Sequence, residues 1–415
     1  MRPPARGGAR LLSCVGLAAA LLLPAALPAR AASFSGLPTA DGTKGQELPG
    51  MPSALDPEAE QVACTPASRR QAEKQDWSRQ RLDLDRLHRH STGTGVTVAL
   101  IDTGVAPDAA GLGGRVTAQG AAGDDCVGHG TFLAGLIAGT GGGSTALAGV
   151  APGAKILALR GTDRRGEAGA GLVAEAVREA TAARAGVIAV TVALPRRDAE
   201  LTRAVAAARR AGAVVVAAAA PDPPPRGGTD EIPSRTYWPA REPGVLSVAD
   251  MLPSGARPDG SPATGGVDLA APGAGVVSGG PRGAGHYLGA GASVATAYAA
   301  GAAAAVRAAR PDDSAAAVTR RLTATAYPAD IPQLDPYAAV TTVLGEAGSP
   351  VGTDRGSDPV TLRDTSAADR ATSRATLFVL LGTAAVLAVL WAAFALPRAR
   401  ARGWRPAGAG GAGNE

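Results

Sequence analysis

The sequence predicts an α/β fold in which a doubly wound parallel sheet carries helices on both faces. Short runs such as residues 96–101 and 214–216 are apolar throughout instead of alternating, which is typical of strands buried on both sides. Ala-rich stretches such as "LVAEAVREATAARA" (172–185) separate these runs and have the length and composition of helices. In this fold class, functional side chains are expected at the carboxyl ends of the strands.

The length and composition favour one large core with appendages, although two small domains are the alternative. Of the 415 residues, 46% are hydrophobic, which is enough to fill one sizeable core. Basic residues gather at the two ends: residues 1–31 carry a net charge of +4 and residues 397–415 one of +3, against +5 for the whole chain. The rest of the chain is therefore at about −2, and no nucleic-acid partner is expected.

The first 31 residues have the pattern of a secretory signal peptide. Three arginines precede the apolar run "LLSCVGLAAALLLPAALPA", and Ala29-Arg30-Ala31 fits the small-x-small motif that signal peptidase accepts. Lipidation at Cys14 is a weaker alternative, because this Cys comes before most of the apolar run instead of after it. The sequence thus predicts export, with cleavage before Ala32.

Residues 377–396 are predicted to form a transmembrane helix. The stretch "LFVLLGTAAVLAVLWAAFAL" has no charged residue, and as a helix it would be about 30 Å long, the thickness of the hydrocarbon core. A buried core helix is the alternative. The basic cluster "RARARGWR" in the tail, residues 397–415, indicates the cytoplasmic side. We therefore expect a single-pass protein of the cell membrane with its main domain outside the cytoplasm.

Between these ends, the composition divides the chain into three parts. Residues 32–76 form an N-terminal extension rich in Gly, Pro and Ser, residues 77–345 the folded body, and residues 346–376 a flexible linker to the membrane. Signal cleavage leaves two cysteines, Cys64 and Cys126, in a compartment where disulfides persist. We predict that they pair; two unrelated buried thiols are the alternative.

Three polar residues stand at the ends of predicted strands or at the starts of predicted helices. Asp102 closes the strand at 96–101, His129 precedes the apolar helix "TFLAGLIAG", and Ser293 precedes a long Ala-rich helix. Taken singly, the Asp is typical of a turn and the Ser of a helix cap. The His is a less usual residue at the start of a buried helix, because its ring needs a polar partner.

Together these stretches resemble the motifs of the subtilisin-like serine proteases. "VALIDTGV" resembles the family's Asp motif, "GHGTFLAG" its His motif and "GASVATAYAAG" its Ser motif, in the subtilisin order. The Cys-bearing extension, "RLDLDRLHRHSTGTGVTVALIDTGV", "LDPYAAV" and the C-terminal span are similar to the mycosin subfamily, membrane-anchored proteases associated with type VII secretion. The resemblance covers roughly residues 85–345.

The resemblance implies a catalytic triad that needs no cofactor. Ser293 would be the nucleophile, His129 its general base, and Asp102 the group that orients His129. The substrate would be a protein or peptide, and the partner a type VII secretion membrane complex. No metal site is expected, because the four His residues and the Cys pair do not have ligand spacing.

One departure from the family pattern concerns the oxyanion hole, the pair of donors that stabilises the tetrahedral intermediate. The family has Gly-Asn after the strand "VVVAAA"; the aligned residues here are Ala220 and Pro221, so the Asn donor is replaced by Pro221 and only the Ser293 backbone N–H remains. Loss of one such donor costs about 10²- to 10³-fold in turnover, a value measured on subtilisin itself. Asp222 does not compensate, because an ionised carboxylate repels the oxyanion.

Two classes of function therefore stay open. The first is an exported serine endopeptidase, slow because the oxyanion Asn is missing, that cuts a secreted or cell-surface protein. The second is a pseudoprotease that serves as a scaffold of the secretion complex. The extension could also be a propeptide, although a Cys64–Cys126 bond would hold it beside His129 and favour a permanent wrap. Thr191 to Ala193 align with the family's substrate-pairing strand, where β-branched side chains are expected to narrow the cleft.

Overall fold

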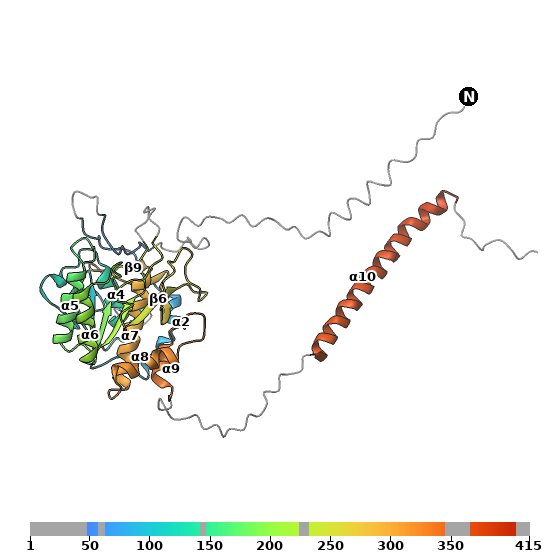
Figure 1. The fold of residues 1–415 in the computed structure, drawn as a ribbon. Coiled ribbons are helices and arrows are strands. Elements are labelled where there is room, and N and C mark those ends of the chain that lie inside the picture. Colours follow the sequence, from blue (N-terminus) through green and yellow to red (C-terminus); the bar gives the residue numbers. More distant parts are fainter. Residues whose placement is uncertain (1–47, 57–62, 142–146, 224–231, 345–365, 404–415) are drawn as a thin grey trace, which may run out of the picture. The chain divides into compact units, whose positions relative to one another are not determined.

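The structure is a computed structural model of the full chain, and it describes residues 48–56, 63–141, 147–223, 232–344 and 366–403. The chain divides into two compact units, residues 1–344 and 345–415. The first unit holds the sheet and the helices around it, and the second holds the helix α10 (Ser366–Ala401) (Figure 1). The predicted signal peptide, most of the predicted linker and the end of the cytoplasmic tail lie outside the described residues.

The predicted parallel sheet is confirmed, with seven strands in the order β2-β3-β1-β4-β5-β6-β7. All its pairings are parallel. The strands are β1 (Thr97–Asp102), β2 (Val116–Ala118), β3 (Lys155–Arg160), β4 (Val187–Val190), β5 (Val214–Ala218), β6 (Leu246–Met251) and β7 (Leu269–Pro272). A separate antiparallel hairpin joins β8 (Val276–Gly279) to β9 (His286–Gly289). The chain order reverses at β1, which lies between β3 and β4, and a polar site is expected at the carboxyl end of such a strand.

Helices cover both faces of the sheet, as the uniformly apolar strands predict (Figure 1). On β1, Val98 and Leu100 join one core while Ala99 and Ile101 join the other. The first core is shared with α4 (His129–Ala138) and α7 (Ala292–Ala309), the second with α5 (Ala170–Ala182) and α6 (Ala199–Arg210). Short helices complete the unit: α2 (Trp77–Arg81), α3 (Leu84–His88), the 3₁₀ turn η1 (Gly120–Gly123), α8 (Ala315–Ala324) and α9 (Pro336–Thr341).

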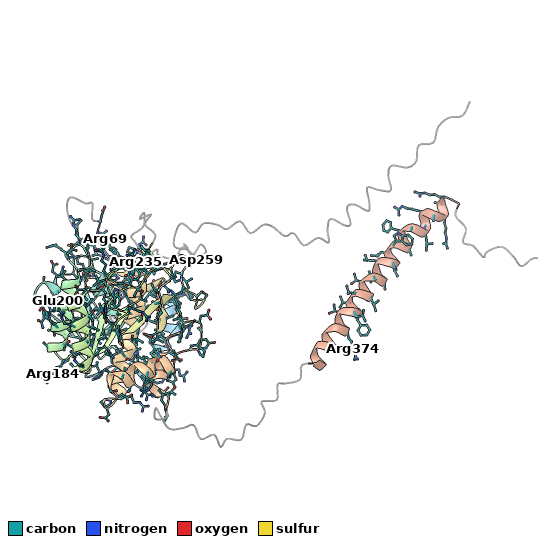
Figure 2. All side chains as sticks on the ribbon, viewed as in Figure 1. Arg69, Arg184, Glu200, Arg235, Asp259 and Arg374 are labelled. Atoms are coloured by element: carbon teal, nitrogen blue, oxygen red, sulfur yellow. A yellow bond between two sulfur atoms is a disulfide. The ribbon has the colours of Figure 1, made fainter. Side chains whose placement is uncertain are left out.

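Helix α7 is buried over most of its length because nearly all its residues are small. Every residue from Ala292 to Val306 is buried, and a Cβ at Gly301 would meet the Cβ of Val150 at 2.7 Å. A helix that is apolar all round is stable only when it is covered on every side. Its first turn, which holds Ser293, is therefore fixed by packing against the sheet. By contrast, charged side chains such as Arg184 and Glu200 lie on the outside of this unit (Figure 2).

The described part of the N-terminal extension runs along the body without regular secondary structure. Residue Gly50 forms a parallel bridge with Leu288 of β9, and Cys64 forms a disulfide with Cys126. The Thr65 amide donates to the Cys126 carbonyl at 2.9 Å, and the Thr65 hydroxyl donates to the Val127 carbonyl at 2.5 Å. The extension is thus attached covalently and by hydrogen bonds to the loop that precedes His129.

Helix α10 contains the predicted span and begins earlier than the sequence indicates. Residues Ser366 to Thr376, which we assigned to the flexible linker, are helical. The Ala-rich sequence there extends a helix that the apolar segment nucleates, because adding a residue to a helix costs far less than starting one. From Arg374 to Ala401 the helix is long and apolar enough to cross a membrane, and its apolar side chains are exposed on all sides (Figure 2).

Candidate active site

The site begins at the carboxyl end of β1, where Asp102 is 1% exposed. Its carboxylate accepts hydrogen bonds from the Thr103 amide (2.7 Å), from the Thr191 hydroxyl, and from Nδ1 of His129, which lies 2.9 Å from Oδ1 and 3.0 Å from Oδ2. A buried carboxylate needs such donors to stay ionised. The strand order of the sheet supplies one of these donors, because β4 is the neighbour of β1 and leads directly into Thr191.

His129 is the first residue of α4 and is 5% exposed. It follows Gly128, whose φ of 92° lies in the left-handed region that favours glycine, and precedes Gly130. A Cβ at Gly130 would lie 2.0 Å from the carbonyl oxygen of Gly104. Only glycine lets the start of α4 approach the end of β1 this closely. That approach brings the imidazole to Asp102.

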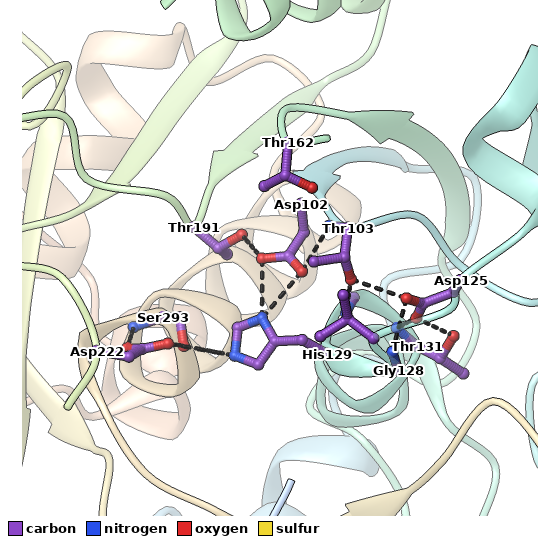
Figure 3. Close-up of polar contacts among 12 residues, drawn as sticks. Asp102, Thr103, Asp125, Gly128, His129, Thr131, Thr162, Thr191, Asp222 and Ser293 are labelled. Atoms are coloured by element: carbon purple, nitrogen blue, oxygen red, sulfur yellow. Dashed lines mark hydrogen bonds and ion pairs between the residues drawn. The ribbon is translucent and has the colours of Figure 1, made fainter. Parts of the chain in front are cut away.

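A second buried carboxylate, Asp125, fixes the loop before His129. It accepts hydrogen bonds from the Gly128 amide (2.8 Å), from both the amide (2.8 Å) and the hydroxyl (2.6 Å) of Thr131, and from the Thr103 hydroxyl (2.9 Å). The Thr103 hydroxyl in turn accepts from the Gly130 amide at 2.9 Å. Burial raises the pKa of Asp125 even though these donors oppose the rise. The network joins β1 to α4 on both sides of His129 (Figure 3).

Ser293 stands in the first turn of α7 and is fully buried. Its Oγ lies 3.1 Å from Nε2 of His129, so Asp102, His129 and Ser293 form one continuous chain of hydrogen bonds (Figure 3). The three predicted residues, which come from β1, α4 and α7, are therefore brought together. This is the arrangement in which an imidazole can take the proton of a serine hydroxyl.

The pKa values of the Asp102 and His129 pair move apart for one shared reason. Burial would raise the pKa of Asp102. The charge and hydrogen bond of His129, together with the hydrogen bonds from Thr191 and Thr103, outweigh burial and hold this pKa below its usual range. Burial would lower the pKa of His129, but the carboxylates of Asp102 and Asp222 raise it well above the usual value. The imidazolium is thus stabilised at this site.

The side chain beside the Ser293 amide belongs to Asp222, one residue beyond Pro221. Asp222 Oδ1 accepts from the Ser293 N–H at 3.0 Å, and Oδ2 accepts from the Ser293 Oγ–H at 2.5 Å. Oδ2 also lies 3.2 Å from His129 Nε2, and the side chain is 8% exposed. The sequence alignment placed Pro221 at the oxyanion position and Asp222 next to it. In the structure it is Asp222 that contacts the nucleophile, because the chain after β5 turns this carboxylate toward the start of α7.

Sequence reasoning also missed the supporting residues. Thr191 was expected to narrow the cleft, but it is 5% exposed and its hydroxyl donates to the Asp102 carboxylate. Asp125 and Thr103 were not singled out either. Both stand within three or four positions of a triad residue, and an Asp so close to a predicted His would have been the available signal.

The comparisons with known proteins agree with this geometry. The family model of the subtilases, peptidase S8, matches residues 93–368. This chain belongs to the subtilase family of serine proteases. Mycosin-1 of Mycobacterium tuberculosis is 43% identical over 90 residues, which are 21% of this chain and 20% of that protein. The sequence match thus spans about a fifth of the length of the curated relative.

Solved structures extend the likeness to more than two thirds of this chain. The MycP3 protease from the type VII (ESX-3) secretion system is 30% identical, with a TM-score of 0.59 over 71% of this chain and 97% of that chain. MycP1 from Mycobacterium smegmatis is 26% identical, with a TM-score of 0.56 over 73% of this chain and 91% of that one. The predicted resemblance to mycosin-like subtilases is confirmed.

Proposed function

We propose that this protein is a membrane-anchored serine endopeptidase that acts outside the cytoplasm on a secreted or cell-surface protein. The hydrogen-bond chain Asp102–His129–Ser293, with distances of 2.9 and 3.1 Å, carries the proposal. A serine hydroxyl is a weak nucleophile at neutral pH, so a base within hydrogen-bond reach is the feature that catalysis needs most. The site has that base, and the base has its orienting carboxylate.

In the proposed mechanism, His129 Nε2 takes the proton of Ser293 Oγ as that oxygen attacks the carbonyl carbon of the scissile bond. Asp102 holds the Nδ1 proton of His129 and stabilises the imidazolium that forms. The tetrahedral oxyanion accepts a hydrogen bond from the Ser293 N–H, at the amino-terminal end of α7, where the helix dipole favours negative charge. His129 then gives its proton to the leaving amine, and water hydrolyses the acyl-enzyme by the same steps.

The proposed location depends on the two ends of the chain. Residues 1–31 would direct export and be removed, and the span in α10 would anchor the protein, with the basic residues after Leu396 in the cytoplasm. The similar MycP3 and MycP1 proteases belong to type VII secretion systems. We extend that setting to this chain: it would act beside a type VII secretion membrane complex, on a protein or peptide substrate.

A second candidate function is a catalytically impaired scaffold of the same complex. The position of Asp222 favours it, since a carboxylate occupies the place beside the Ser293 amide where the family has an Asn side chain that donates. Asp222 Oδ2 also lies 2.5 Å from the Ser293 Oγ, closer than the 3.1 Å from Oγ to His129 Nε2, so a carboxylate competes with the base for the nucleophile's proton. With one oxyanion donor missing, turnover would be about 10²- to 10³-fold slower than with both.

A fluorophosphonate probe, which reacts with activated serines, tests the proposed activity. Membranes that contain the full chain are treated with the probe, and wild type is compared with Ser293→Ala and His129→Ala. The matched control is Ser278→Ala, which removes a buried hydroxyl that donates to the Phe132 carbonyl outside the triad. Labelling that needs Ser293 and His129 but not Ser278 supports the peptidase. No labelling of folded wild type at any pH contradicts it and favours the scaffold.

A further inference from the structure

Asp222 is the one acidic residue, among those that the structure describes, whose carboxylate touches the nucleophile Ser293 directly (Figure 3). Its Oδ1 accepts a hydrogen bond from the Ser293 amide at 3.0 Å, and its Oδ2 accepts one from the Ser293 hydroxyl at 2.5 Å. Because the N–H of the nucleophilic serine marks where the oxyanion forms, Oδ1 stands at the position that the substrate oxygen must reach. Asp222 therefore either leaves this place during the reaction or takes part in it.

The space beside the Ser293 amide accommodates the carboxyl group of Asp222 because the residue next to it is a glycine. Gly291 precedes the first turn of α7 with a φ of 126°, and a Cβ there would lie 2.0 Å from Oδ1 of Asp222. The absence of that Cβ is what lets the carboxyl group reach both the amide and the hydroxyl of Ser293. In this state the side chain is 8% exposed and has three polar contacts, two to Ser293 and one to His129. For the oxyanion to reach the Ser293 N–H, Oδ1 must release that donor while the carboxyl group stays beside it.

Ionisable groups lie on two sides of Asp222. His129 of α4 lies 3.2 Å from Oδ2, with Asp102 beyond it on the other side of the ring. From β6, the buried Asp250 faces the same region, and Arg257 pairs with Asp250 at 3.2 Å. Burial raises the pKa of Asp250, Arg257 opposes this rise, and the nearby Asp222 adds to it. Asp222 thus has the ring of His129 on one side and a second buried carboxylate, that of Asp250, near it on the other.

We propose that Asp222 is a further catalytic residue, which as a neutral carboxylic acid donates its O–H to the oxyanion in place of the family's side-chain amide. This inference rests on the proposed peptidase function. A neutral carboxylic acid presents one O–H donor, whereas the carboxylate presents none. The Ser293 N–H and the Asp222 O–H then form a complete oxyanion hole.

The protons balance as follows in the acylation step. The resting pair of His129 and Asp222 holds one proton between Nε2 and Oδ2, in addition to the Nδ1 proton that faces Asp102. In the reactive form this proton is on Asp222, so His129 Nε2 is free to accept the proton of Ser293 Oγ. As the bond from Oγ to the carbonyl carbon forms, the electron pair of the C=O bond moves to oxygen, and Asp222 donates a hydrogen bond to it while keeping its proton.

This arrangement gives the reaction rate a bell-shaped dependence on pH. Both the acid limb and the alkaline limb of the bell arise from the pair of His129 and Asp222. With a second proton on the pair, His129 cannot act as the base. With no proton on the pair, the donor is lost and a carboxylate opposes the oxyanion. Two groups that interact this strongly titrate together, and the two limbs cannot be assigned to one residue each.

The test measures the second-order rate of fluorophosphonate labelling of the full chain in detergent, from pH 4 to 10. Asp222→Asn restores an amide donor, so at alkaline pH it is expected to react about 10²- to 10³-fold faster than wild type and to lose the alkaline limb. Asp222→Ala supplies neither donor nor charge, and at the wild-type optimum it is expected to react about 10²-fold slower than wild type. Asp250→Asn is the matched control: it neutralises the nearby carboxylate that does not touch Ser293, so it should shift the bell without removing a limb.

Each outcome separates the inference from the function on which it rests. If Asp222→Ala reacts as fast as wild type or faster at every pH, Asp222 only obstructs the site and the inference is overturned while the peptidase stands. If Asp222→Asn labels through Ser293 but wild type labels at no pH, the inference is also overturned. In that case the triad can react, and the Asp222 carboxylate prevents it from reacting in wild type. If neither protein labels through Ser293 although both melt cooperatively, the proposed function itself fails.

Discussion

Two carboxylates flank the ring of His129, Asp102 at Nδ1 and Asp222 at Nε2, and they have opposite relations to the same imidazole. Asp102 accepts from groups that take no part in bond making, the Thr103 amide and the Thr191 hydroxyl, and so it is free to orient the base. Asp222 accepts from the nucleophile itself. The same chemical group therefore supports general-base catalysis on one side of the ring and competes with it on the other, according to which donors the fold supplies.

The largest effect is expected from removing the nucleophile Ser293 or the ring of His129 between the two carboxylates. The variants Ser293→Ala and His129→Ala should each hydrolyse a peptide ester about 10⁶-fold more slowly than wild type, because the nucleophile or its base is gone. The full chain in detergent is assayed for ester hydrolysis beside Ser278→Ala. Residual activity within 10-fold of wild type in either triad variant would mean that another group performs the reaction.

Neutralising Asp102 is expected to have the next largest effect. Asp102→Asn keeps the shape of the side chain but favours the wrong tautomer of His129, which costs about 10⁴-fold in kcat. The comparison with Asp222→Asn is direct, since the same replacement on the other side of the ring should accelerate the reaction at alkaline pH. If both variants were slower at every pH, the contrast between the two carboxylates would be wrong.

The Cys64–Cys126 disulfide is expected to stabilise the loop that precedes His129, on the side of the ring that faces Asp102. Replacing both Cys64 and Cys126 by Ser opens a link between residues 62 positions apart, which should lower the free energy of unfolding by about 2–4 kcal/mol. For a unit of this size, Tm should fall by roughly 3–7 °C. The melting of the full chain in detergent checks this, with wild type under reducing conditions as a second arm. An unchanged Tm would show that the hydrogen bonds of the extension hold it in place without the disulfide.

A smaller effect is expected at Thr191. The variant Thr191→Val removes one of the donors of Asp102 while it keeps the branched shape, so it should reduce kcat by about 10-fold, the equivalent of one hydrogen bond to a charged group. With one donor fewer, the pKa of Asp102 should be less depressed. Its carboxylate should then interact more strongly with His129 and raise the pKa of that ring further, so the acid limb of the pH profile should move to higher pH. A loss of stability without any movement of this limb would assign Thr191 a packing role only.

The smallest effect concerns stability as a function of pH. The pKa of His129 is raised in the folded protein, so its contribution to stability is fully present below the unfolded value of about 6.5 and is lost as pH rises through the raised pKa. In Asp222→Asn, one of the two carboxylates that raise this pKa is gone. The loss of Tm with rising pH should then be smaller and end at lower pH than in wild type, which a series of melts between pH 6 and 9 would detect.

Most of the fold and the triad could be read from the sequence, because both depend on local patterns. Uniformly apolar strands indicate a sheet covered on both faces, and the Gly-bounded stretches around Asp102, His129 and Ser293 place each residue at the end of its element. The place of Asp222 could not be read. The strand before it ends in four consecutive alanines, Ala217 to Ala220, which give an alignment no fixed register. Its contact with Ser293 joins positions 71 residues apart, so it depends on tertiary structure.

The disulfide between Cys64 and Cys126 also sets how the chain would respond to a cut. A single break of the backbone anywhere between these two residues leaves both pieces covalently joined, whereas a break before Cys64 frees everything on its amino-terminal side. The first kind of nicked protein would migrate as one species without reductant and as two species with it. Paired gels with and without reductant would therefore show whether a processing event lies between residues 64 and 126 or outside this loop, even before its exact position is known.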